Sequence, residues 1–189
     1  MSAKTVSIII PAYNESARIM STLQSVKKYL AQSDFHHEVI IVDDGSSDDT
    51  VEVIKRSAAD VPDLNILINT ENRGKGFSVQ RGMLAASGEY RLFMDADGSV
   101  DISHLDPFMS CALEDDVDVV IGSIHAGASG VREHNGWHRR VLGKLANMAV
   151  QTLAVPGIHD TQRGFKLFSA RAAECIFSMQ TVERFGFDI

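Results

Sequence analysis

Short apolar runs alternate with helical patterns along this chain, and the alternation limits its fold more than any other feature. Residues 5–10 form a β-branched, almost unbroken apolar run, which is typical of a parallel strand covered on both faces. Pro11 is expected to end that strand. The next segment carries apolar residues at helical spacing, namely Ile19, Leu23, Val26 and Leu30. The predicted unit is a strand, a polar loop and a helix.

The same unit recurs, which predicts an α/β fold. Further strands are expected at residues 38–42, 64–68, 90–94 and 117–122, and the polar turn at 160–168 is expected to lead into another strand. Helices are expected around 50–58, 77–87, 103–114, 135–155 and 170–178. Strands and helices that alternate at this spacing predict a Rossmann-like, doubly wound, mostly parallel sheet with helices on both faces. Residues 123–130 are small and Gly-rich, and we expect a mobile flap there.

Length and charge narrow the class of protein. With 189 residues and 44% hydrophobic content, the chain is long enough for one well-filled domain. The formal net charge of -7 argues against a nucleic-acid partner, which would need a basic surface. Cys111 and Cys175 lack metal-ligand spacing, so we expect both to be core residues in a reducing, cytoplasmic environment.

Asp95 and Asp97 are the strongest candidates for chemistry. They follow the apolar run 90–94, and an extended backbone would point both carboxylates to the same side. Two carboxylates suit a hard divalent cation such as Mg²⁺ or Mn²⁺ that also binds substrate phosphates. Taken alone, the pattern favours a structural turn in which Gly98 provides the bend.

Polar loops follow four of the predicted strands. They occupy residues 11–15, 43–48, 72–76 and 95–98. Because ligands of doubly wound sheets bind beyond the carboxyl ends of the strands, these loops predict one shared binding site.

Five motifs together resemble those of family 2 glycosyltransferases with the GT-A fold. They are Pro11-Ala12-Tyr13-Asn14-Glu15, Val42-Asp43-Asp44-Gly45-Ser46, Asn72-Arg73-Gly74-Lys75-Gly76, Asp95-Ala96-Asp97-Gly98 and Asp160-Thr161-Gln162-Arg163-Gly164-Phe165-Lys166. The last of these and residues 182–188 are similar to segments of polyprenyl (dolichyl) phosphate sugar synthases, above all the dolichyl-phosphate β-glucosyltransferases. The resemblance implies a single GT-A catalytic domain over 1–189, truncated at its C-terminus, with a donor half at about 1–122 and an acceptor half at about 123–189.

The resemblance also implies roles on the donor side. Tyr13 and Glu15 would border the nucleotide, Asp43 would hydrogen-bond its base, and Asp44 would cap a turn. Lys75 would meet phosphate, and Asp95 and Asp97 would bind Mg²⁺ or Mn²⁺. The implied donor-binding residues are Pro11, Ala12, Tyr13, Glu15, Asp43, Gly74, Lys75, Asp95 and Ala96.

On the acceptor side, the resemblance implies an inverting transfer of glucose or, as second choice, mannose to a polyprenyl phosphate. The phosphate needs cations rather than a base, because it is already ionised near neutral pH. The candidates for these cations are Arg132, Arg139, Arg140, Arg163 and Lys166. The implied catalytic residues are Asp97, Asp160, Asp188, Arg139 and Arg140, with Asp160 and Asp188 orienting the acceptor or the metal.

The implied partners are UDP-glucose or GDP-mannose, a lipid phosphate, the cytoplasmic face of a membrane and a possible second copy of the chain. Ile124 departs from the family, which usually has an arginine there, so the contact with the acceptor phosphate is either missing or supplied by Arg132. A polysaccharide-forming family 2 enzyme and a non-catalytic nucleotide-sugar binding module remain alternatives. An NAD-binding protein is disfavoured, because Pro11 and its neighbours stand where a Gly-x-Gly-x-x-Gly motif would be needed.

Overall fold

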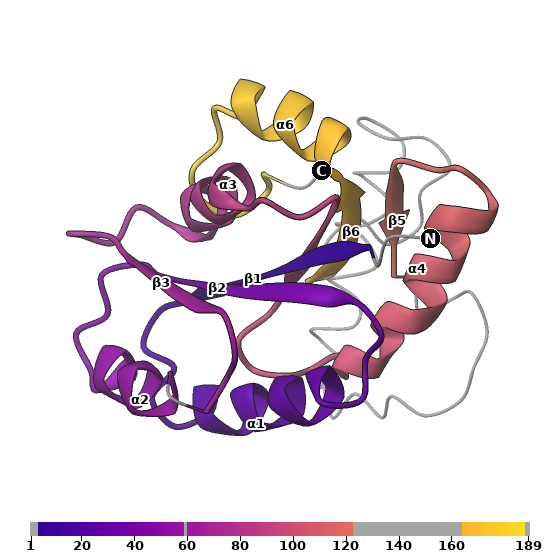
Figure 1. Cartoon of the computed structure of the whole chain (residues 1–189). Coiled ribbons are helices and arrows are strands. Elements are labelled where there is room, and N and C mark those ends of the chain that lie inside the picture. Colours follow the sequence, from indigo (N-terminus) through magenta and orange to yellow (C-terminus); the bar gives the residue numbers. More distant parts are fainter. Residues whose placement is uncertain (1–3, 59, 123–163, 188–189) are drawn as a thin grey trace, which may run out of the picture.

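A six-stranded sheet forms the centre of the protein (Figure 1), whose computed structural model describes residues 4–58, 60–122 and 164–187. The strands lie in the order β3-β2-β1-β4-β6-β5. Their bounds are β1 Thr5–Ala12, β2 His36–Asp43, β3 Leu64–Ile68, β4 Tyr90–Met94, β5 Val119–Ile121 and β6 Phe165–Ser169. The helices are α1 Ile19–Leu30, α2 Thr50–Ser57, α3 Lys75–Ala85, α4 Leu105–Glu114 and α6 Ala170–Met179, with a 3-10 turn at Ile102–His104.

The first four strands run parallel, as the sequence predicts. β1 pairs in parallel with both β2 and β4, and β2 pairs in parallel with β3. β6 is the exception, because it lies antiparallel between β4 and β5. The prediction of a mostly parallel α/β sheet is confirmed, and the reversed strand adds that the sheet is mixed.

Alternate residues of the central strands feed two separate cores. Ile8 and Ile10 of β1 pack in the core beneath α1, α2 and α4, whereas Ile9 packs in the core beneath α3 and α6. Figure 1 shows the two groups of helices on opposite sides of the sheet. All three isoleucines are fully buried, which explains why the run reads as continuously apolar rather than alternating.

Pro11 does not end β1 as expected. The strand continues to Ala12, and Pro11 lies opposite Val42 of β2. The pairing of β1 with β4 has already stopped at Ile9 and Phe93. The Ala12 carbonyl accepts the Asp44 amide on the β2 side at 2.8 Å, so the backbone nitrogen of the preceding residue, Pro11, faces the β4 side. No β4 residue pairs there, and the missing N–H of Pro11 therefore costs no hydrogen bond.

Some expectations fall outside the described residues, and a second one is wrong. The flap at 123–130 and the helix at 135–155 both lie outside them. Cys175 is exposed and Cys111 is only half-buried, so the expectation that both are core residues is incorrect. Within the described segments, no helix has both the length and the apolar character that crossing a bilayer requires.

Candidate functional site

A cleft of about 410 Å³ opens at the carboxyl ends of β1, β2 and β4. This volume is within the range of small-molecule sites, and the position is where doubly wound sheets bind ligands. The residues that line the cleft are Pro11, Ala12, Tyr13, Glu15, Asp44, Asn72, Gly74, Lys75, Ser78, Asp95, Ala96, Asp97, Arg184 and Phe185.

The loop after β1 is fixed to the loop after β2. The Glu15 amide donates to Thr50 Oγ1 at 2.8 Å, and the Ser16 amide donates to Asp48 Oδ2 at 3.2 Å. Burial alone would raise the pKa of Asp48, but hydrogen bonds from Thr50 and Ser16 outweigh it and lower the pKa to about 2. Asp48 is therefore ionised and holds in place the wall that presents Tyr13 and Glu15.

Asp44 organises the loop between β3 and α3. Its carboxylate accepts the Gly74 amide at 2.7 Å and the Arg73 amide at 3.1 Å, and it also accepts Asn69 Nδ2 at 2.8 Å. Asp44 is only 3% exposed. A buried carboxylate needs such donors, and here they fix the start of α3, where Lys75 is the first helical residue.

The turn after β4 carries the two carboxylates. Lys75 Nζ lies 2.7 Å from Asp95 Oδ1, and Thr22 Oγ1 on α1 donates to the Ala96 carbonyl at 2.7 Å. Gly164 packs directly on Asp95, because a Cβ at Gly164 would lie 1.8 Å from Asp95 Oδ2. The turn at Asp95 and Ala96 is thus held by contacts from three separate segments.

Asp97 has more freedom than Asp95. It is exposed, and the one hydrogen bond that its carboxylate makes with the described residues comes from its own turn, the Ser99 amide at 2.9 Å. Among the cleft residues, Glu15, Asp44, Asp95 and Asp97 are acidic and Lys75 and Arg184 are basic. This lining is net negative, which favours a cation in the cleft.

The carboxylates fit a hard divalent ion in part. Asp95 and Asp97 offer oxygen ligands on one wall of the cleft, the kind of ligand that Mg²⁺ and Mn²⁺ prefer. No group of three or more His, Cys, Asp or Glu that could hold a metal occurs in the described part of the chain. Mg²⁺ typically takes one or two carboxylates and completes its shell with water and phosphate oxygens, so two carboxylates suffice for that mode.

The segment after α6 forms the outer wall of the cleft. We call residues 180–187 the closing segment. The Phe77 amide donates to the Glu183 carbonyl at 2.8 Å, and Gln180 Nε2 donates to the Gly76 carbonyl at 3.0 Å. Arg73 forms an ion pair with Glu183 and stacks on the Phe77 ring at 3.6 Å. These contacts join the C-terminal part of the described chain to the start of α3.

Most of the predicted donor residues meet in the cleft. Eight of them line it: Pro11, Ala12, Tyr13, Glu15, Gly74, Lys75, Asp95 and Ala96, as does Asp97, the second predicted metal ligand. Asp43 does not. It is 1% exposed, and its Oδ2 accepts the Ser46 amide at 3.0 Å within its own turn. Asp43 therefore has the turn-capping role expected of Asp44, while Asp44 lines the cleft, and a contact of Asp43 with the base stays a prediction.

Most of the acceptor-side predictions concern residues that the structure does not describe. Arg132, Arg139, Arg140, Asp160, Arg163 and Asp188 all lie outside the described residues. Lys166 is described, in β6, but it is 3% exposed and does not line the cleft. Its register opposite Phe93 places it on the face covered by α3 and α6. A role for Lys166 at the acceptor phosphate stays a prediction.

Sequence reasoning assigned no role to four residues of this cleft. They are Asn72, Ser78, Arg184 and Phe185. Arg184 and Phe185 belong to residues 182–188, which carry a family resemblance but no other functional signal in the sequence. That resemblance was the available signal, since 110 positions separate Gly74 from Arg184 and no local pattern connects them.

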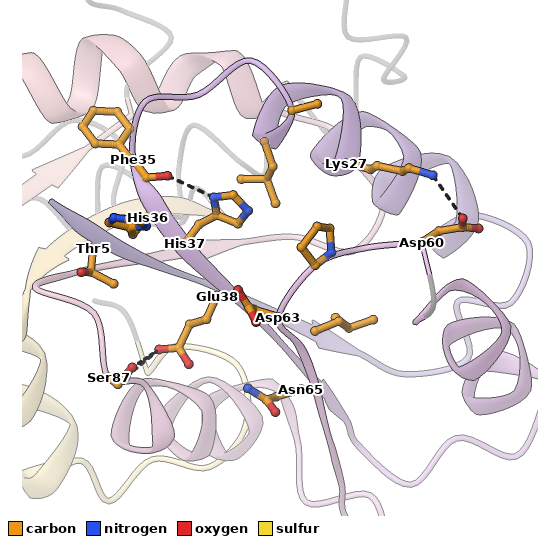
Figure 2. A pocket seen from close by; sticks show the side chains of 14 residues that line it. Thr5, Lys27, Phe35, His36, His37, Glu38, Asp60, Asp63, Asn65 and Ser87 are labelled. Carbon is orange, nitrogen blue, oxygen red and sulfur yellow. Dashed lines mark hydrogen bonds and ion pairs between the residues drawn. The ribbon is translucent and has the colours of Figure 1, made fainter. Parts of the chain in front are cut away.

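A second hollow, of about 650 Å³, lies at the opposite end of the strands, where β1, β2 and β3 begin (Figure 2). His36, His37 and Glu38 at the start of β2 line it. Three of its charged groups already have partners: Lys27 pairs with Asp60 at 3.2 Å, and Glu38 accepts from Ser87. Although it is larger, this hollow lacks the convergent loops of the cleft, so the cleft is the candidate site.

Solved structures share this fold. The chain superposes on Staphylococcus aureus TarS residues 1–349 with a TM-score of 0.65 at 21% identity, covering 97% of this chain and 52% of that one. Mannosyl-3-phosphoglycerate synthase from Rubrobacter xylanophilus gives 0.65 at 17% identity, with 89% and 54% covered. The architecture is the GT-A fold, as the sequence motifs implied.

Sequence relatives and a family model agree with the fold. The chain is 38% identical to the dolichyl-phosphate β-glucosyltransferase of Dictyostelium discoideum, over 97% of this chain and 59% of that protein. It is 32% identical to the human protein of the same name, over 98% and 61%. The chain thus spans about three fifths of the length of these relatives. Residues 7–177 match the glycosyl transferase family 2 model, and the chain belongs to that family.

Proposed function

We propose that this protein transfers glucose from UDP-glucose to dolichyl phosphate, or to another polyprenyl phosphate, with inversion at the sugar. GDP-mannose is the second candidate donor. The relatives named above support the acceptor and the sugar. The observation that carries the proposal is the cleft itself, where Lys75 and two strand-end aspartates face the same space from two different loops.

The donor nucleotide would occupy the wall formed by the β1 and β2 loops. Tyr13 is 46% exposed at the cleft, an exposure that leaves its ring available to a base or ribose. Pro11 and Ala12 shape the floor, and Glu15 borders the ribose. Asp43 lies directly behind this wall with Oδ1 buried and without a hydrogen-bond partner among the described residues. A base N–H would satisfy that oxygen after a small movement.

A divalent metal accounts for the charge of the site. A nucleotide diphosphate is an anion, and the lining of the cleft is net negative, so the donor needs an additional cation to bind well. A 22% identical structural neighbour, the glucosyl-3-phosphoglycerate synthase of Mycobacterium tuberculosis, was solved in complex with Mn²⁺, UDP and glucosyl-3-phosphoglycerate. Asp95 and Asp97 would hold Mg²⁺ or Mn²⁺, which as a Lewis acid would neutralise charge on the departing diphosphate.

In the transfer, an oxygen of the acceptor phosphate attacks the sugar C1 on the face opposite the diphosphate. The C1–O bond to the diphosphate breaks, and its electron pair leaves with UDP. Lys75 stabilises the charge that develops there and keeps Asp95 in position. The acceptor needs no general base because the second pKa of a phosphate monoester is about 6.

The acceptor phosphate would be held by cations of the acceptor half. Arg132, Arg139, Arg140, Arg163 and Lys166 are the candidates, and Asp160 and Asp188 would orient the acceptor or the metal. Because dolichyl phosphate is a membrane lipid, we propose that the protein works as a peripheral protein at the cytoplasmic face of a membrane. A homo-oligomer of the chain is compatible with this proposal.

Calorimetric titration with UDP and GDP, each with and without Mn²⁺, followed by a transfer assay with a short-chain polyprenyl phosphate, tests the proposal. The expected result is Mn²⁺-dependent UDP binding and a β-linked glucosyl phosphate product. UDP binding without transfer would favour a non-catalytic binding module. Transfer to a sugar hydroxyl instead of the lipid phosphate would favour a polysaccharide-forming enzyme. The absence of any nucleotide binding would contradict the proposed function and the two alternatives alike.

A further inference from the structure

Arg184 has no assigned role, although it lines the cleft beside Lys75, Asp95 and Asp97. The other lining cation, Lys75, is already paired with Asp95 at 2.7 Å. Arg184, by contrast, makes no hydrogen bond or ion pair with the described part of the chain. Its side chain is exposed to solvent at the cleft, so its charge is available to a ligand.

The backbone of Arg184 is nevertheless fixed against the Gly74 loop. A Cβ on Gly74 would lie 2.8 Å from Arg184 Cγ, and a Cβ on Gly76 would lie 2.6 Å from the Val182 carbonyl oxygen. Only glycine at these two positions leaves room for so close an approach. The bonds from Phe77 to Glu183 and from Gln180 to Gly76 hold the closing segment in this place.

We propose that Arg184 is a phosphoryl-binding residue of the cleft. Its position against Gly74 lets its guanidinium and the Lys75 ammonium approach a ligand from adjacent points of the same wall. A guanidinium can bind two phosphate oxygens at once, which a lysine cannot do. The inference rests on the proposed function and extends it. The phosphoryl group belongs either to the departing diphosphate or to the acceptor phosphate.

The test compares Arg184→Gln with Arg56→Gln, a matched control at an exposed arginine near the end of α2. Three probes are used with Mn²⁺ present: UDP, inorganic pyrophosphate and a short-chain polyprenyl phosphate in the transfer assay. We expect Arg184→Gln to weaken one class of ligand about 10-fold, the loss of roughly one charge-assisted hydrogen bond, and Arg56→Gln to change none. Arg184→Lys should restore part of the loss.

The outcomes separate the two phosphoryl sources. Weaker binding of both UDP and pyrophosphate assigns Arg184 to the departing diphosphate. An increased KM for the lipid phosphate with unchanged UDP affinity assigns it to the acceptor. Unchanged values for all three probes would overturn the inference, as would a wild-type protein that binds none of them. Pyrophosphate binding that depends on Arg184 without any glucosyl transfer would support the inference while contradicting the proposed function.

Discussion

The Asp44 carboxylate accepts the backbone N–H of Gly74 across two loops, at a distance of 2.7 Å. Asn69 extends this link, because its side-chain amide donates both to Asp44 at 2.8 Å and to Ser78 Oγ at 3.1 Å. The Asn69 side chain in turn accepts from Arg81, which also donates to the Ile68 carbonyl. The end of β2 thereby fixes the position of Lys75 without contacting it.

Replacing Asp44 with Asn should therefore weaken both the fold and the site. An amide has one accepting oxygen instead of two and no charge, so the backbone N–H of either Arg73 or Gly74 loses its partner. We expect the free energy of unfolding to fall by about 2 kcal/mol, the cost of one charge-assisted hydrogen bond in a buried place. UDP affinity should fall as well. Urea denaturation and calorimetric titration measure the two effects.

Asp34→Asn is the matched control for this change, since Asp34 is exposed and does not line the cleft. It should leave both quantities unchanged. An Asp44→Asn variant of wild-type stability and UDP affinity would show that the Gly74 loop holds its position without the carboxylate.

The central strands could be predicted from the sequence because their signals are local. β3 and β4 begin and end at the predicted residues, 64–68 and 90–94, since each is a short apolar run bounded by polar or Gly-containing segments. The direction of β6 could not be predicted in this way. An apolar run has the same pattern whether its strand lies parallel or antiparallel to its neighbour.

For the cleft, the sequence predicts which loops form it but not which of their side chains face the ligand. Asp43 and Asp44 are neighbours with the same chemistry, and the sequence does not tell which one faces the ligand. The position of the Gly74 loop decides this, because its backbone amides bind Asp44 and leave Asp43 to its own turn. The contact of Arg184 with Gly74 depends on how α6 packs on α3, which no local pattern encodes.

The exposed Asp97 gives a second prediction, which separates function from stability. Asp97→Ala should abolish Mn²⁺-dependent UDP binding and transfer, because it removes one of the two proposed metal ligands. Within the described residues its carboxylate accepts one hydrogen bond, from the Ser99 amide in its own turn, so the free energy of unfolding should change by less than about 1 kcal/mol. Titrations with and without Mn²⁺ measure the first effect and thermal denaturation the second.

The control for Asp97 is Asp60→Asn, which removes an exposed carboxylate in the second hollow, at the opposite end of the strands from the cleft. It should leave metal-dependent binding intact. Near-normal turnover by Asp97→Ala would refute the assignment of Asp97 to the metal.

The close approach of the closing segment to α3 gives a third prediction. Gly76→Ala would place a Cβ 2.6 Å from the Val182 carbonyl oxygen and 2.9 Å from those of Glu183 and Arg184. Helix propensity alone would make this change stabilising by about 1 kcal/mol. Because the neighbours are backbone atoms that cannot rotate away, we expect a net loss of about 1 to 3 kcal/mol and weaker UDP binding.

Ala85→Gly at the other end of α3 is the matched control for Gly76→Ala. Ala85 is exposed, so this change should cost up to about 1 kcal/mol through propensity and leave UDP affinity unchanged. A double variant with Arg184→Gln adds a check on the further inference. If the Gly76 change acts by displacing Arg184, the two effects on ligand affinity should not add. Full additivity would place the effect of Gly76 elsewhere.

The low pKa of Asp48 gives a fourth prediction, on the pH dependence of stability. In the folded protein the pKa of Asp48 is about 2, below its ordinary value of 3.8, because Thr50 and Ser16 donate to its carboxylate despite some burial. A carboxyl with a lowered pKa stabilises the fold above its unfolded pKa, and this contribution disappears as the pH falls from about 4 to about 2. Asp48→Asn should reduce the free energy of unfolding by about 1 to 2 kcal/mol at pH 7 and by little near pH 2.

Asp49→Asn, at an exposed neighbour whose side chain caps nothing, should follow the wild-type curve. Urea denaturation between pH 7 and pH 2 measures the three curves, and a constant difference between Asp48→Asn and wild type across this range would show that the contribution of Asp48 does not depend on its ionisation.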